Sequence, residues 1–266
     1  MRFGYLARVI TALALLVLAV FTLKVFFHQP VTVVDPHVVG KQALPQKALL
    51  PDFAAISDIR EKKRAFFDFI RPGVRAANRD IALNRQFLLD LQHKLKIEEN
   101  FEISPSSYQR YSELAQYYQH KSNDVNADSI AKLLSRVDII PEELVMVQAA
   151  NESGWGTSRF ARLGLNFFGQ WCFTQGCGLI PQSRNEGANH EVRVFDSVDQ
   201  SIASYLRNLN THPAYQHLRE IRLELRQNNL EVNPEHLAPG LLNYSERQHD
   251  YVIELLQMLR HNKAFL

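Results

Sequence analysis

The chain has little excess charge of either sign. Its 266 residues include 30 Lys and Arg against 28 Asp and Glu, which gives a formal net charge of +2. The charges are interspersed, so the sequence gives no sign of the basic surface with which proteins bind nucleic acids. No internal repeat is visible, and the hydrophobic fraction of 46% suffices for a sizeable core. We expect one large domain, or a medium one with an appendage, and no nucleic-acid partner.

Cysteine is scarce, since the chain contains only Cys172 and Cys177. Their spacing matches no standard zinc motif, and the nearest further ligand is His190. In an oxidising compartment the two thiols would close a small loop. A local disulfide is therefore favoured over free thiols and over a metal site, and no cofactor is expected.

The longest apolar run lies at the N-terminus. Arg2 and Arg8 precede an apolar stretch over residues 9–23, which Lys24 and residues 25–27 extend. Its length approaches the roughly 20 residues that cross a bilayer. No Ala-x-Ala cleavage site follows, so an anchor over residues 1–28 is favoured over a cleaved signal peptide. The flanking charges predict that the rest of the chain is exported, whether residues 1–28 stay as an anchor or are cleaved.

A segment with several prolines follows the apolar run, and helical periodicity begins after it. Residues 29–52 contain four prolines and little helical periodicity, which indicates an extended linker. From Phe53 the spacing of apolar residues predicts a helical appendage over residues 53–124. Its first apolar face should end at Arg71-Pro72-Gly73, and a second long helix should follow.

The remaining residues, 125–266, predict a further domain. Residues 166–196 mix aromatics and glycines with the alternating run Val192-Arg193-Val194-Phe195, so a small β-hairpin lobe is expected. The capping sequence Ser197–Gln200 begins another helix, and the last helix is expected over residues 246–261. The fold class is therefore α+β and mostly helical.

One carboxylate, Glu152, stands at the end of an apolar helix. Val145, Ala149 and Glu152 fall at i, i+4 and i+7, so Glu152 continues the apolar stripe. Gly154 and Gly156 are expected to end the helix. Partial burial and the negative helix terminus both predict a raised pKa, which a general acid needs. A buried Glu in an ion pair is the alternative interpretation.

Four aromatics crowd near this turn. Flat rings beside a lone acid suit a groove that stacks sugars, and core packing is the alternative for each of them. We take Trp155, Asn166, Phe168 and Trp171 as candidate substrate-binding residues. Trp155, between glycines, is expected to be exposed, whereas Phe167 or Phe168 should lie in the core. Asn166 should hydrogen-bond either a ligand or its own loop.

These motifs together resemble a known family. The chain has E-S-x-x-G-x-S over residues 152–158, followed by Asn166-Phe167-Phe168-Gly169. This pattern resembles that of the glucosaminidases, endo-beta-N-acetylglucosaminidase-like peptidoglycan hydrolases. The segment Gln170–Gly178, with its two cysteines, is closest to the bacterial Bax-type branch. The resemblance covers residues 125–262 and implies a lysozyme-like α+β domain.

The resemblance implies cleavage of β-1,4 glycosidic bonds at N-acetylglucosamine, with Glu152 as general acid. It matches Tyr244 to a cleft tyrosine whose hydroxyl would orient a water or the substrate acetamido group. Many members carry a second acid in a T-x-E-Y-like segment that this chain lacks. Glu186 is preferred over Glu191 as its replacement, because its neighbours indicate a mobile loop tip. Without a second acid, the acetamido group would act as nucleophile.

Three alternatives use the same groove. A lytic transglycosylase also needs a single acid, and an amidase would cut the stem peptide instead. A non-catalytic wall-binding scaffold is the third, with residues 53–124 recruiting partners. The expected partners are glycan strands and, through residues 1–28, the membrane. The sequence names no protein partner.

Overall fold

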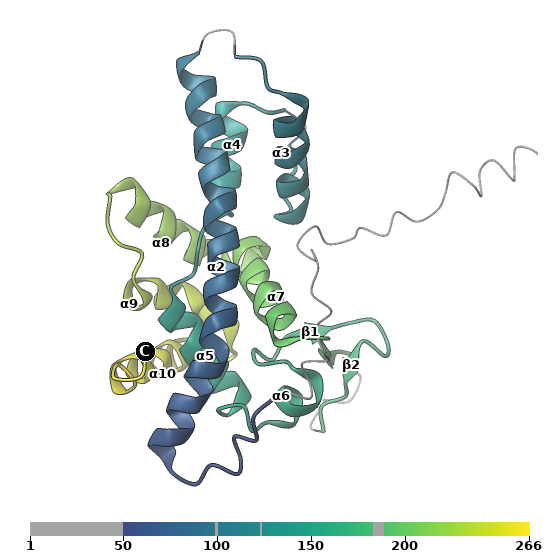
Figure 1. Cartoon of the computed structure of the whole chain (residues 1–266), viewed down its shortest axis with the longest axis vertical. Helices are drawn as coiled ribbons and strands as arrows, with labels where there is room; N and C mark the ends of the chain where they lie inside the picture. The colour runs from purple at the N-terminus through teal and green to yellow at the C-terminus, as the bar shows by residue number, and fades with distance from the viewer. Residues whose placement is uncertain (1–49, 99–100, 123, 183–188) are drawn as a thin grey trace, which may run out of the picture. The chain divides into compact units, whose positions relative to one another are not determined.

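The computed structural model describes residues 50–98, 101–122, 124–182 and 189–266 (Figure 1). These residues belong to one compact unit that spans Leu44–Leu266. The predicted anchor over residues 1–28, and the linker up to residue 49, lie outside the described residues. Among the residues described, no helix is both long and apolar enough to span a membrane.

The long helix α2 (Ile59–Ile97) organises the fold. Asp58 caps it by accepting a hydrogen bond from the Glu61 amide at 2.7 Å. Figure 1 shows α2 alongside α4 (Ala127–Leu134), α5 (Glu142–Ser153) and α7 (Val198–Thr211), and it contacts all three. Its buried side chains belong to the same hydrophobic core as those of the later helices. Residues 53–124 therefore pack directly against the domain predicted over residues 125–266. The boundary between the two at residue 125 stays a prediction.

The predicted helix break at Arg71-Pro72-Gly73 is wrong, because α2 continues through Pro72. Proline leaves one carbonyl of the preceding turn without its helical donor. Tertiary contacts on either side of Pro72 hold the helix together. The Arg71 guanidinium donates to Glu142 at 2.6 Å, and a Cβ on Gly73 would lie only 2.6 Å from Asp199 Oδ1. Pro72 and Asp68, whose carbonyl loses its donor, are both exposed, so water can bond to that carbonyl.

The remaining helices complete the fold around α5. The last helix begins at residue 249 and not at the expected 246, because a short 3₁₀ segment and a turn precede it. The remaining helical elements are α3 (Pro105–Tyr117), α6 (Arg159–Gly164), η2 (Pro213–Tyr215), α8 (Gln216–Gln227), α9 (Pro234–Leu237), η3 (Ala238–Tyr244) and α10 (His249–His261).

A small antiparallel sheet forms the predicted β lobe. Its strands are β1 (Trp171–Cys172), β2 (Gly178–Leu179) and β3 (Glu191–Arg193), in the order β1-β3-β2. Val192 lies opposite both Trp171 and Leu179. The expected strand over residues 192–195 is therefore real but ends at Arg193. The mostly helical α+β class is confirmed.

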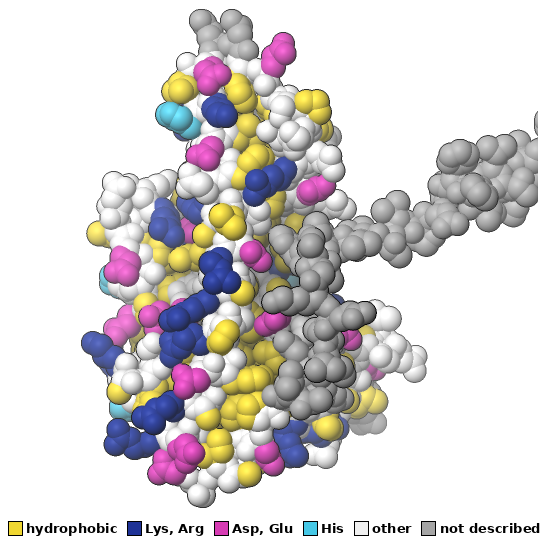
Figure 2. Space-filling model, in the orientation of Figure 1, with side chains coloured by type: hydrophobic (Ala, Val, Ile, Leu, Met, Phe, Trp, Pro, Cys, Tyr) yellow, Lys and Arg dark blue, Asp and Glu magenta, His cyan; other side chains and the backbone are white. Residues whose placement is uncertain are grey.

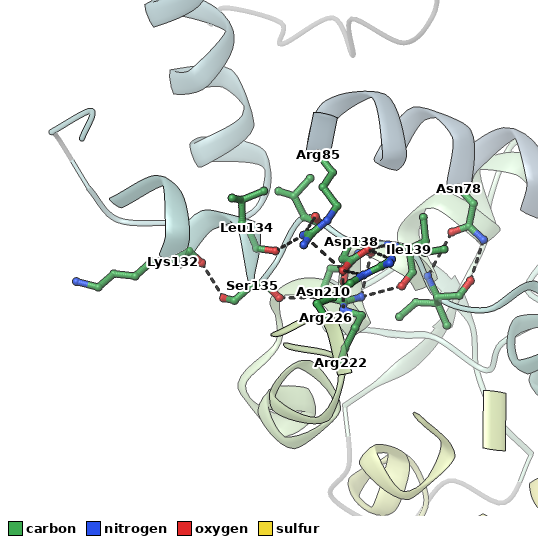
Figure 3. A network of polar contacts seen from close by, with 12 residues as sticks. Asn78, Arg85, Lys132, Leu134, Ser135, Asp138, Ile139, Asn210, Arg222 and Arg226 are labelled. Atoms are coloured by element: carbon green, nitrogen blue, oxygen red, sulfur yellow. Dashed lines mark hydrogen bonds and ion pairs between the residues drawn. The ribbon is translucent and has the colours of Figure 1, made fainter. Parts of the chain in front are cut away.

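A buried ionic network fixes the loop between α4 and α5 (Figure 3). Asp138 is 2% exposed and accepts two hydrogen bonds from Arg226, at 2.9 and 3.0 Å. Arg85 lies 3.4 Å from its carboxylate and Arg222 lies 3.9 Å away. Burial raises the pKa of Asp138, but Arg226 hydrogen bonds and the three positive charges hold it below its ordinary value. Because this loop leads into α5, the network fixes the start of the helix that carries Glu152.

Candidate active site

Glu152 lies in the last turn of α5, where the sequence places it. The helix is buried along most of its length, and Glu152 is half-buried. Gly154 ends the helix with φ 56°, and the backbone stays left-handed through Trp155 (φ 57°) and Gly156 (φ 76°). The Ser153 hydroxyl accepts from the Gly156 amide at 2.8 Å and fixes this turn. A bulky residue at positive φ is strained, and such strain is concentrated at functional sites.

One oxygen of the Glu152 carboxylate is held by a chain of buried donors. The Tyr251 hydroxyl donates to Glu152 Oε1 at 2.8 Å, and Gln148 Nε2 donates to the Tyr251 oxygen at 3.0 Å. Tyr205 in turn donates to Gln148 Oε1. Tyr205 thus donates to Gln148, Gln148 to Tyr251, and Tyr251 to Glu152, and this series of hydrogen bonds fixes the orientation of the Glu152 side chain.

Sequence reasoning missed this chain of donors. Gln148 lies four residues before Glu152 on the same helix face, and this spacing is its only local signal. Tyr205 and Tyr251 belong to the apolar stripes of α7 and α10 and are 0% and 1% exposed. In the sequence they are indistinguishable from ordinary core tyrosines.

The environment raises the pKa of Glu152 above its ordinary value. Burial is the largest cause, and the negative charge of Glu254 adds to it. The Tyr251 hydrogen bond and the charge of Arg247 act in the opposite direction without cancelling the effect. Arg247 forms its ion pair with Glu254, and Glu152 belongs to no ion pair of the described residues. The carboxyl thus keeps its proton to higher pH, as a general acid requires.

The other oxygen of the carboxylate faces Gly169. This glycine has φ 63°, and a Cβ built on it would lie 3.5 Å from Glu152 Oε2. Within the described ranges no hydrogen bond is made to Oε2. Because Gly169 has no side chain, no side chain of this residue covers Oε2.

We expect Gly169→Ala to lower turnover by roughly tenfold to a hundredfold, because the new methyl group, in ordinary van der Waals contact with Glu152 Oε2, would hold a substrate about 1 Å further from that oxygen. The new methyl group would touch Glu152 Oε2. An alanine at this positive φ should also lower the free energy of unfolding by about 1–2 kcal/mol. Gly176→Ala is the matched control, because Gly176 has φ 80° and nothing within 4 Å of its Cβ position. Equal rates for the two variants in a reducing-end assay would contradict this placement of Oε2.

Tyr244 supports the site through its ring and its backbone contact. Its hydroxyl donates to the Phe168 carbonyl at 2.7 Å, and its ring stacks on Tyr251 with centroids 5.5 Å apart. Burial raises the pKa of Tyr244 well above its ordinary value, so the hydroxyl stays protonated. Its role in orienting a water or an acetamido group stays a prediction.

The structure does not place Asn166 or the Phe168 ring at a binding surface. Asn166 Nδ2 donates to the carbonyls of Gln170 and Arg193, and its Oδ1 accepts from the amides of Phe168 and Gln170. These four bonds use the full capacity of the amide, so Asn166 holds its own loop. Phe168 is 1% exposed and stacks on Tyr205 at 4.0 Å. No sugar can reach the ring, and Phe167 is also buried.

The two tryptophans have different surroundings. Trp155 is half-buried, not exposed as expected, because its ring packs edge-on against Phe66 and Phe67 of α2. Trp171 is 55% exposed on the β lobe, and its ring stacks on His190 at 4.0 Å. Trp171 thus remains the candidate for stacking on a sugar.

The structure joins Cys172 and Cys177 by a disulfide bond. The Glu191 carboxylate accepts from the amides of Gly176 at 2.9 Å and Gly178 at 2.7 Å, so it holds the disulfide loop. The two sulfurs and a Glu191 oxygen lie within 4.8 Å of one another, but disulfide sulfurs are not the thiolates that bind metals. Glu191 is buried and engaged in this loop. The preferred second acid, Glu186, lies outside the described residues.

Comparison with known proteins shows to which family the chain belongs. The glucosaminidase family profile, described as mannosyl-glycoprotein endo-beta-N-acetylglucosaminidase, matches residues 127–264 and so includes Glu152 and Tyr251. Protein Bax of Escherichia coli K12 is 33% identical over 218 residues, which are 82% of this chain and 76% of the relative. No solved structure matches the chain. The chain therefore belongs to the glucosaminidase family, as a Bax-type member.

Proposed function

We propose that this protein is a peptidoglycan hydrolase that cleaves β-1,4 glycosidic bonds at N-acetylglucosamine, with Glu152 as the general acid. The observation that carries the proposal is the state of this one carboxyl group. Its pKa is raised by burial, Tyr251 holds one oxygen, and Gly169 leaves the other uncovered. Membership of the glucosaminidase family supports a glycan as substrate.

In the proposed reaction, protonated Glu152 gives its proton to the oxygen of the leaving sugar as the glycosidic bond breaks. A second group completes the step at the anomeric carbon. Either it bonds there and a water later displaces it, or it takes the proton of a water that attacks directly, and both routes consume one water and leave a new reducing end. Glu186 is the preferred carboxylate for this task, and the acetamido oxygen of the substrate is the alternative. Glu191 is the weaker candidate, because its carboxylate holds the amides of the disulfide loop.

We place this activity in the periplasm, with residues 1–28 as an inner-membrane anchor or, alternatively, as a cleaved signal. The disulfide between Cys172 and Cys177 supports an oxidising compartment. The wall substrate supports the same location. Fractionation of cells, followed by protease treatment of spheroplasts, would test the assignment.

Mass spectrometry of purified peptidoglycan digested with the full-length protein tests the proposed function. New reducing N-acetylglucosamine ends are the expected product. Anhydro-muramyl ends would identify a lytic transglycosylase, and released stem peptides would identify an amidase. Binding to the wall without any new ends would identify a scaffold.

A further inference from the structure

An open cavity with polar and apolar walls adjoins the end of α5 and is not used by the proposed reaction. Its volume is about 340 Å³, and it lies between α2, α5 and α10. Figure 1 shows the first half of α2 beside these two helices. The side chains that matter for its chemistry are Lys63, Asn151, Trp155, Glu254, Met258 and Asn262.

Asn262 contributes a buried hydrogen-bond acceptor without a donor. The residue is 2% exposed, and its Nδ2 donates to the Met258 carbonyl at 2.7 Å. Its Oδ1 has no hydrogen-bond partner among the described residues. Buried polar atoms are normally paired, so an orphaned oxygen in the wall of a cavity indicates a missing N–H or O–H donor.

Lys63 contributes a positive charge at the same cavity. Its ammonium group lies 5.3 Å from the centroid of the Trp155 ring, and it forms no ion pair in the described part of the chain. Residues 60–64 carry four basic side chains against the single acid Glu61. Lys and Arg side chains also gather along the visible face of α2 (Figure 2). The acid Glu254 also lines the cavity, but it is paired with Arg247. The charge of Lys63 is therefore left to attract a carboxylate at this end of the cavity.

The surroundings of Trp155 favour a peptide over a sugar as the occupant. Phe66 and Phe67 pack against its ring, with centroids 5.7 and 5.2 Å away, and Lys63 lies over it. The ring is thus already engaged by protein groups, whereas a sugar platform needs a free face. An acceptor and a cation within one small cavity instead match the N–H and carboxylate groups of a short acidic peptide.

The cavity is close to the proposed catalytic carboxyl. Asn151 lines it and directly precedes Glu152 in the chain. Glu254 also lines it, and its charge contributes to the raised pKa of Glu152. A ligand that extends past the end of α5 can therefore occupy both places.

We propose that this cavity binds the stem peptide carried by the wall glycan, with Lys63 pairing to a peptide carboxylate and Asn262 Oδ1 accepting a peptide N–H. This inference rests on the proposed function for the identity of the sugar strand. It adds a peptide subsite to the glycan site, so the protein selects strands that carry their peptides.

The test compares glycan strands that carry stem peptides with strands from which the peptides have been removed. We expect the wild-type protein to prefer the peptide-bearing strands by about tenfold in kcat/KM, the effect of one charge-assisted hydrogen bond. Lys63→Met should abolish this preference and Lys63→Arg should restore it. Lys62→Met is the matched control and should keep it. A wild-type protein without the preference, or a Lys63→Met protein that retains it, would overturn the inference.

A binding measurement separates this inference from the proposed function. The free acidic stem tetrapeptide is titrated into the full-length Glu152→Gln protein by calorimetry, with and without Lys63→Met. Peptide binding that depends on Lys63 supports the subsite even if no wall digestion is found. Absence of binding, or displacement of the peptide by N-acetylglucosamine oligomers, would overturn the subsite even if the wall is cleaved.

Discussion

The Glu152→Gln protein is expected to lose turnover on peptidoglycan by about 10²–10⁴-fold, the contribution typical of a general acid. Glutamine cannot donate the proton to the leaving oxygen, but its carbonyl can still accept the Tyr251 hydrogen bond. The fold and wall binding should therefore persist. The rate of appearance of reducing ends measures turnover, and co-sedimentation with wall material measures binding.

The free energy of unfolding of the Glu152→Gln protein shows whether it has lost its turnover because it lacks the proton donor or because it does not fold. The pKa of folded Glu152 is raised above its ordinary value of 4.5, so folding is favoured by protonation. The contribution of this proton to the free energy of unfolding is fully present below the unfolded pKa and is lost as pH rises through the folded pKa. Gln does not titrate, so Glu152→Gln should be at least as stable as the wild type at pH 7.

The matched control for this substitution is Glu143→Gln, in the first turn of the same helix. Its turnover should equal that of the wild type. A folded Glu152→Gln protein with wild-type turnover would remove Glu152 from the mechanism. The same conclusion would follow if the two Gln variants lost equal activity.

The Asp138→Asn protein is expected to lose about 3–5 kcal/mol of stability, the usual effect of breaking a buried ion pair. Arg222 is 1% exposed, and Arg226 and Arg85 also approach the same carboxylate. Removing the negative charge leaves these guanidinium groups without their counter-ion. Urea denaturation of both proteins at pH 7 measures the difference.

The effect should also depend on pH. The pKa of folded Asp138 is held below its ordinary value, so its contribution is present above the unfolded pKa and is lost as pH falls through the folded pKa. The gap between wild type and variant should therefore shrink in acid. Asp128→Asn is the control, because Asp128 pairs with Lys132 on the surface and such pairs contribute little. A loss below about 1 kcal/mol at pH 7 would contradict the role given to the network.

Local patterns predicted the parts of the fold that local physics determines. The apolar spacing before Glu152 and the glycines after it predicted the helix and the place where it ends. Alternation around Val192 predicted the β lobe, and the close spacing of two cysteines predicted their bond. Each of these features depends on residues within a few positions of one another.

Features created by distant contacts were not predictable in this way. Pro72 lies within a helix because Arg71 and Gly73 make contacts with α5 and α7. Tyr251 reaches Glu152 only when α10 packs against α5, 99 positions away in the sequence. The sequence left open whether Asn166 bonds a ligand or its own loop, and only the folded structure shows that it bonds the loop.

The pH dependence of kcat/KM in the wild type and in Tyr251→Phe tests most directly whether protonated Glu152 is the acid. Activity should fall at high pH as this carboxyl ionises. The Tyr251 hydroxyl stabilises the ionised form, so its removal should move this basic limb to higher pH. Tyr111→Phe, whose hydroxyl bonds Ser129 away from the site, should leave the limb in place. A basic limb that stays fixed or moves to lower pH in Tyr251→Phe would contradict the assignment of Glu152.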